Sequence, residues 1–166
     1  MSQTSYPMNQ PEAVAGNLAD VGNNDIISRS AEAALVFGLG VMVGTDKDKQ
    51  AKVLTSGVHA SNVIDEKKFL GVTVRDLARE NLASSTNGYE TYDSAAIIRR
   101  GRIYVKVEEA VTTEDPVYVR HTTGTGTVIG AFRKSADTNT AALLTNARWE
   151  KGASANGFAV LSVNLA

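Results

Sequence analysis

The chain has 166 residues, and its 17 Lys and Arg residues nearly balance 18 Asp and Glu residues, giving a formal net charge of −1. It has no cysteine, which excludes disulfide bonds and thiolate metal sites, and the near-neutral charge does not support general nucleic-acid binding. No apolar run approaches the roughly 20 residues that span a membrane, and the start of the chain lacks the basic and apolar stretches of a signal peptide.

Residues 1–24 have almost no hydrophobic periodicity, because prolines, glycines and amides interrupt them. Alone, such a segment cannot bury enough apolar surface to offset its ordering entropy. One interpretation is a disordered terminus. The other is an extended N-terminal arm that becomes ordered against another subunit, because the segment carries spaced apolar anchors: Tyr6, Met8, Val14 and Leu18. We predict this arm at residues 1–24 and a β-rich body at residues 25–166.

The first part of the body contains one ambiguous segment and two predicted strands. Residues 25–34 could form a short helix or extended chain. Residues 35–44 alternate apolar positions with glycines, which predicts a strand with a bulge or a close backbone approach. Residues 68–75 also alternate and predict a strand.

The central block, residues 94–133, is read as short strands separated by turns. Residues 102–108 alternate apolar and polar side chains, which is the period of a strand with one buried face. Further strands are predicted at residues 95–100, with a turn at Gly101, and at residues 117–121, 127–133 and 158–165. Trp149 is predicted to be a core anchor. Closely spaced strands of this kind predict a mainly β fold, an antiparallel sandwich or barrel.

The chain shows no catalytic constellation. His59 and His121 have no further ligand at useful spacing, so a zinc site is not supported. Glu108 and Glu109 are neighbours, and their side chains would point to opposite faces if the strand continued. We therefore predict no catalytic residue, no cofactor and no metal ligand.

One basic cluster stands out, formed by Arg99, Arg100 and Arg102. Three guanidinium groups in four residues could pair with acidic patches or phosphates of a partner. They could equally be charges that protect a strand corner from edge pairing. Nucleic acid fits the cluster least well, because no interleaved aromatic side chains supply stacking surfaces.

A family resemblance begins at Ala15-Gly16-Asn17-Leu18-Ala19-Asp20. Together with residues 26–34 and the stretch Val36-Phe37-Gly38-Leu39-Gly40-Val41-Met42-Val43-Gly44, this segment resembles the structural cement proteins of tailed bacteriophages, also called head decoration proteins. The stretches 69–74 and 100–103 look like further units of the same family.

The resemblance implies a β-tulip-like body behind an extended N-terminal segment, and no catalytic residues. It implies a homotrimer at three-fold and quasi-three-fold positions on the outer capsid surface, after assembly in the host cytoplasm. The implied partner is the major capsid protein, whose adjacent subunits the trimer clamps, with no direct contact to nucleic acid or membrane. The arm anchors would be the capsid contacts.

Two alternatives remain open at this level. A tail or baseplate component would also be β-rich and trimeric. A trimeric β-fold nucleotide hydrolase would need convergent carboxylates and phosphate-binding loops, which the sequence does not reveal.

Overall fold

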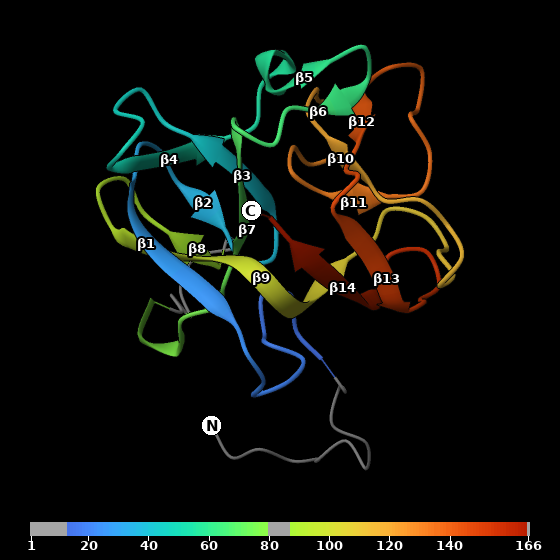
Figure 1. Cartoon of the computed structure of the whole chain (residues 1–166), viewed down its shortest axis with the longest axis horizontal. Helices are drawn as coiled ribbons and strands as arrows, with labels where there is room; N and C mark the ends of the chain where they lie inside the picture. The colour runs from blue at the N-terminus through green and yellow to red at the C-terminus, as the bar shows by residue number, and fades with distance from the viewer. Residues whose placement is uncertain (1–12, 80–86, 166) are drawn as a thin grey trace, which may run out of the picture.

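The computed structural model describes residues 13–79 and 87–165, and its secondary structure is almost entirely β (Figure 1). Two short 3₁₀ helices, η1 (Ser56–Val58) and η2 (Leu77–Arg79), lie between strands. No helix in these ranges is long and apolar enough to cross a membrane. The strands are β1 (Asp25–Ala31), β2 (Leu35–Val36), β3 (Gly40–Val43), β4 (Gln50–Val53), β5 (His59–Ala60), β6 (Val63–Ile64), β7 (Phe69–Thr73), β8 (Gly88–Tyr89), β9 (Ser94–Lys106), β10 (Tyr118–Arg120), β11 (Phe132–Arg133), β12 (Ala141–Leu143), β13 (Ala147–Lys151) and β14 (Phe158–Asn164).

The 13-residue strand β9 joins the two halves of the body. In its first half, Ile98 pairs with Ile26 of β1 on one side and with Val72 of β7 on the other. The pairings of β1 with β4, β4 with β3 and β3 with β7 then close five strands into a ring. These strands and the β2–β8 pair contribute the first core cluster: Ala31, Leu35, Phe37, Val41, Ala51, Leu70, Tyr89, Ala95 and Ile97.

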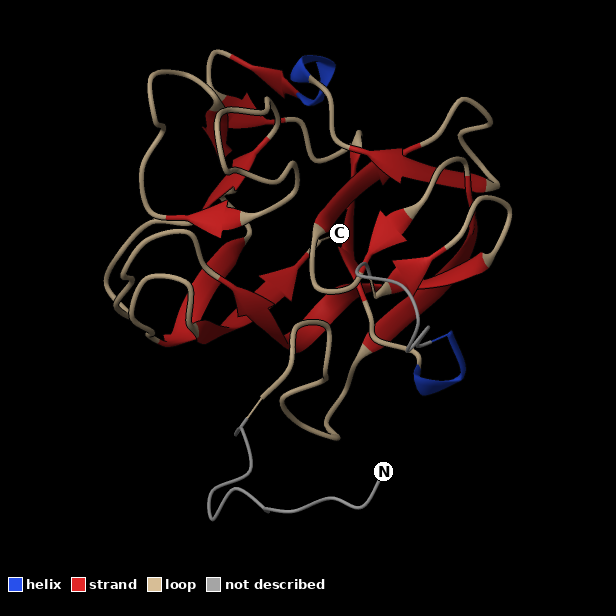
Figure 2. Ribbon diagram, turned by 180° about the vertical axis from the view of Figure 1, so that it is seen from behind, coloured by secondary structure: helices blue, strands red, loops and turns tan. Residues whose placement is uncertain are grey.

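The second half of β9 pairs with β14, and β14 pairs with β13. Ile103 of β9 lies opposite Leu161 of β14, and both are buried. The five-stranded sheet β11-β10-β12-β6-β5 contributes Val119 and Phe132 to a second core cluster, which also includes Ile103, Leu161 and Trp149. Figure 2 shows this half from the opposite side. The predicted mainly β class with antiparallel-rich sheets is confirmed, and so is the role of Trp149 as a core anchor.

The turn predicted at Gly101 is wrong, because β9 runs without a break from Ser94 to Lys106. Gly101 has a φ of 135°, and a Cβ atom at this position would collide with the side-chain oxygen of Asn24. Glycine therefore allows the strand to bend and another segment to approach its backbone, rather than ending the strand.

The single strand predicted at residues 35–44 is also wrong, because a turn separates β2 from β3. Gly38 has a φ of 74° in this turn. The hydroxyl group of the buried Thr73 donates to the carbonyl oxygen of Val36 at 2.6 Å and accepts from the Leu39 N–H at 3.1 Å. A side chain that is distant in sequence thus makes the hydrogen bonds of this turn, and the local sequence pattern does not reveal it.

Three other predicted segments, residues 25–34, 127–133 and 158–165, have different outcomes in the structure. Most of the ambiguous segment 25–34 is extended chain, since β1 covers Asp25–Ala31, and a bend follows at residues 32–33. Only the end of residues 127–133 is a strand, because Gly126 and Gly130 have φ values of 71° and 87° and hold the residues between them in turns. The predicted terminal strand at residues 158–165 is confirmed as β14.

Candidate functional site

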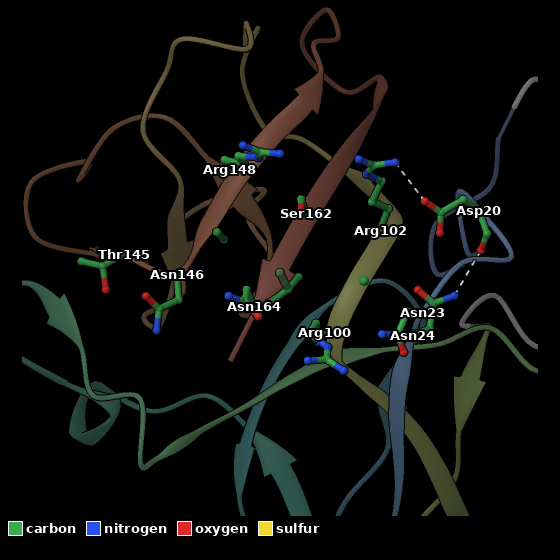
Figure 3. A pocket seen from close by; sticks show the side chains of 13 residues that line it. Asp20, Asn23, Asn24, Arg100, Arg102, Thr145, Asn146, Arg148, Ser162 and Asn164 are labelled. Carbon is green, nitrogen blue, oxygen red and sulfur yellow. Dashed lines mark hydrogen bonds and ion pairs between the residues drawn. The ribbon is translucent and has the colours of Figure 1, made fainter. Parts of the chain in front are cut away.

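A surface groove with polar walls lies where β9, β13 and β14 meet residues 20–24 (Figure 3). Its volume is about 580 Å³. The sheet forms its floor, and the turn that precedes β1 forms one wall. The groove is therefore built from a rigid sheet and a segment next to it, and not from loops alone.

The registers of the three strands place polar side chains in rows across the groove. The first row consists of Arg102 of β9, Ser162 of β14 and Arg148 of β13. The second row consists of Arg100 of β9, Asn164 of β14 and Asn146, which directly precedes β13. Successive strand residues point to opposite faces, so Ile103 and Leu161, which are next to the first row, fill the core. Because Ser162 is small and stands between two arginines, the middle of the first row is hollow.

The charges in the groove are only partly balanced. Asp20 accepts from the Arg102 guanidinium at 3.1 Å. Glu150 pairs with Arg148 at 2.7 Å and with Arg102 at 3.8 Å. Arg100 is exposed and has no carboxylate partner among residues 13–79 and 87–165. The groove therefore presents one guanidinium group whose charge is not compensated.

The described part of the predicted arm is bound to β9 beside this groove. The N–H of Gly16 donates to the Tyr104 carbonyl at 2.8 Å, and the N–H of Tyr104 donates to the Asn17 carbonyl at 2.8 Å. The N–H of Ala19 donates to the Arg102 carbonyl at 2.9 Å. Residues 16–19 thus extend the pairing of β9, and the structure brings this segment together with the basic cluster.

The individual predicted contact residues have different environments. Leu18 is 37% exposed and forms an isolated bridge with Ile103, while Val14 is half-buried. Tyr6 and Met8 lie outside the described residues. Arg100 and Arg102 line the groove, whereas Arg99 does not.

Among the groove residues that were missed from the sequence are Arg148, Asn146 and Asn164. Each is polar and unremarkable in its own stretch. Only the register between β9, β14 and β13 places them beside the arginines of β9. The alternating pattern of β14 indicated that the side chain of Asn164 points outward, but the local sequence did not indicate which residues lie beside it.

A second polar cluster is held together by the buried Arg120, which is 1% exposed, and its carboxylates are partly exposed. Arg120 binds both oxygens of Glu108 at 2.8 and 3.0 Å through Nε, and it binds Asp137 at 2.6 Å. The hydrogen bond from Arg120 is the main reason that the pKa of Asp137 is lowered, and Glu108 is the main reason that the pKa of Arg120 is raised. Arg133 pairs with Glu108 at 3.0 Å and Asp137 at 2.9 Å, so the cluster fixes the segment before β12.

The expectation that Glu108 and Glu109 point apart depended on a continuing strand. The strand β9 ends at Lys106, and both carboxylates reach Arg133, at 3.0 Å and 3.4 Å respectively. Both therefore belong to the ionic cluster around Arg120.

The two histidines, far apart in sequence, are stacked. The ring centroids of His59 and His121 are 4.1 Å apart with an interplanar angle of 33°. Burial is the main reason that the pKa of His121 is lowered, and the neighbouring His59 and Arg120 lower it further. In the described ranges, no group of three or more His, Cys, Asp or Glu side chains could hold a metal ion.

Comparison with known proteins gives matches over nearly the full length of the chain. The family model described as structural cement protein (E217 gp24/Pam3 gp6) matches residues 2–164. A solved chain from the capsid of Myoviridae phage XM1 superposes with a TM-score of 0.75 at 15% identity, covering 98% of this chain and 97% of that chain. No curated protein matches. At this identity the superposition shows a shared fold, which extends over both halves of the body.

Proposed function

Because the chain belongs to the phage structural cement protein family, we propose that it binds the outer surface of the phage head and stabilises contacts between major capsid protein subunits. The observation that carries this proposal is the family match over residues 2–164, which includes the N-terminal segment and the whole β body. A structural role in the virion follows from the family. The outer surface, the assembly in the host cytoplasm and the clamping of subunits are the proposed part.

The N-terminal segment supports a tethering role. Ala13 is buried and residues 16–19 are hydrogen-bonded to β9, so the preceding twelve residues start from a fixed point on the body. They contain two of the predicted anchors, Tyr6 and Met8. We propose that these two side chains, with Val14 and Leu18 at the exit point, contact the major capsid protein. An arm that orders on binding can cover a large surface from a small body.

The truncation that tests this proposal ends at residue 12. A longer deletion of residues 2–24 would also remove the backbone bonds to Tyr104 and Arg102 and the ion pair between Asp20 and Arg102. It would therefore confound loss of the arm with damage to the body.

The experiment measures co-sedimentation of the purified protein with expanded capsids assembled without it. We expect the full chain to bind saturably, and the chain lacking residues 2–12 to bind at least about tenfold more weakly, because loss of two buried apolar anchors removes several kcal/mol of contact energy. Circular dichroism checks that both proteins unfold at the same temperature. No binding by the full chain would overturn the proposed function, and equal binding by both would overturn the role of the arm.

A further inference from the structure

We propose that the polar groove over β9, β13 and β14 binds carboxylate side chains of a partner protein, with Arg100 as the residue that pairs with them. The inference rests on the proposed function only for the identity of the partner, which would be an acidic segment of the major capsid protein. The binding chemistry follows from the groove itself.

Hydrogen-bond donors that suit a carboxylate ligand lie around the guanidinium group of Arg100. Arg100 has no carboxylate partner among the described residues, although it is exposed beside the groove. A guanidinium group offers five N–H donors in a planar fork that matches a carboxylate. The side-chain amides of Asn146 and Asn164 share its row and can donate to the same ligand. Arg102 and Arg148 supply further positive potential, although Asp20 and Glu150 reduce it.

The groove is also fixed before a ligand arrives. Arg100 and Asn164 occupy opposed positions on two paired strands, so their separation is set by the sheet. Asp20 accepts from the Gly22 N–H at 3.3 Å, and Asn24 donates to the Asp20 carbonyl at 3.2 Å, which closes the turn at the wall. Side chains held on rigid elements lose less entropy on binding, which favours specific recognition by few contacts.

A nucleic-acid backbone fits this groove less well than a protein carboxylate. Binding of a polyphosphate requires several uncompensated cations along its length. Among the described residues of the groove, Arg100 alone has a guanidinium group without a carboxylate partner, and the carboxylates of Asp20 and Glu150 flank the site.

The test is an NMR titration of the isotope-labelled full chain with the peptide acetyl-Glu-Glu-Glu-amide. We expect saturable shifts of the side-chain amide signals of Asn146 and Asn164. We expect Arg100→Gln to weaken binding about fivefold, the range for one exposed charge-assisted pair. The matched control is Lys106→Gln, which removes one exposed positive charge from the same strand but outside the groove. It should leave the peptide affinity within about twofold.

Both variants must first give the NMR spectrum of a folded protein, so that a loss of binding cannot be due to unfolding. Absence of groove shifts in the wild type, or equal loss in both variants, would overturn the carboxylate site. Larger groove shifts with a single-stranded oligonucleotide than with the peptide would overturn it in favour of nucleic acid. Co-sedimentation with capsids separates the two proposals: if wild type and Arg100→Gln bind capsids equally, the partner assignment fails while the proposed function stands.

Discussion

At the scale of single residues, Arg120 carries the largest predicted effect on stability. Its buried guanidinium neutralises Glu108 and Asp137, and Arg133 contacts both of the same carboxylates. Without Arg120, only Arg133 would neutralise Glu108 and Asp137, and Asp137 is partly exposed, so we expect a loss of about 2–3 kcal/mol, at or below the low end for a fully buried ion pair. We expect Arg120→Gln to lower the free energy of unfolding by this amount, measured by urea denaturation at pH 7.

The control for Arg120→Gln is Arg148→Gln, which removes an arginine whose side chain is 72% exposed. Exposed ion pairs contribute at most about 1 kcal/mol, so this variant should remain close to wild type. Similar losses in the two variants would mean that the ionic cluster around Arg120 does not stabilise the fold beyond a surface pair.

From the stacked pair His59 and His121 we predict that the protein loses folding stability in mild acid. The pKa of His121 is lowered in the folded state, so the folded protein binds fewer protons there than the unfolded chain. The stability is therefore complete above the unfolded pKa of about 6.5 and falls as the pH drops below it. Replacement by His121→Phe keeps an aromatic ring against His59 and removes the proton site.

The measurement for the histidine pair is the free energy of unfolding at several pH values between 7.5 and about 5. We expect a decline in the wild type and a flatter profile in His121→Phe. The carboxylates with lowered pKa, namely Glu32, Asp115 and Asp137, lose their contribution only below about pH 4.5, so they do not overlap this window. Equal slopes for the two proteins would exclude His121 as the source.

The sequence patterns indicated which single residues are buried, but they indicated much less about which side chains those residues contact. The position of His121 on the strand face of Val117 and Val119 is consistent with its burial, and Trp149 was identified as a core residue. The stack with His59 was not predictable, because it depends on how β5 and β10 are placed within one sheet.

At the scale of elements, Gly101 is a sensitive position within the long strand β9. A Cβ atom there meets the side chain of Asn24, and a φ of 135° is strained for any other residue. We expect Gly101→Ala to destabilise the protein by more than about 1 kcal/mol and to displace the groove wall. Gly57→Ala is the control, because Gly57 has no positive φ and only a distant contact with Thr55. Thermal unfolding of both variants checks the prediction, and equal midpoints would contradict it.

Strand prediction succeeded where alternation reflects one buried face, as in β14 and in the second half of β9. It failed at residues 35–44, where the Thr73 hydroxyl closes a turn from a distant strand. It failed again at residues 127–131, where Val128 and Ile129 are β-branched but lie between two glycines with positive φ. β-branched residues favour a half-buried surface. Such a surface can be part of a turn as well as part of a hydrogen-bonded strand pair.

At the scale of the whole molecule, the candidate site combines segments that the sequence shows separately. The basic cluster and the N-terminal segment were both identified, but their contact through Asp20 and Arg102 was not. Their meeting depends on the pairing of residues 16–19 with the far half of β9. The third component, Arg148 on β13, becomes a neighbour only through the register of β14.

The last prediction concerns the assembly state. Each contact proposed for one chain, an arm of twelve residues and a single uncompensated guanidinium, is small. Three linked copies would bind a site of matching symmetry with far higher avidity than one copy. We expect light scattering after size-exclusion chromatography to give a mass of about three times 17.6 kDa. A monomer at all concentrations would contradict a preformed trimer, and capsid binding would then depend on the arm as the main tether.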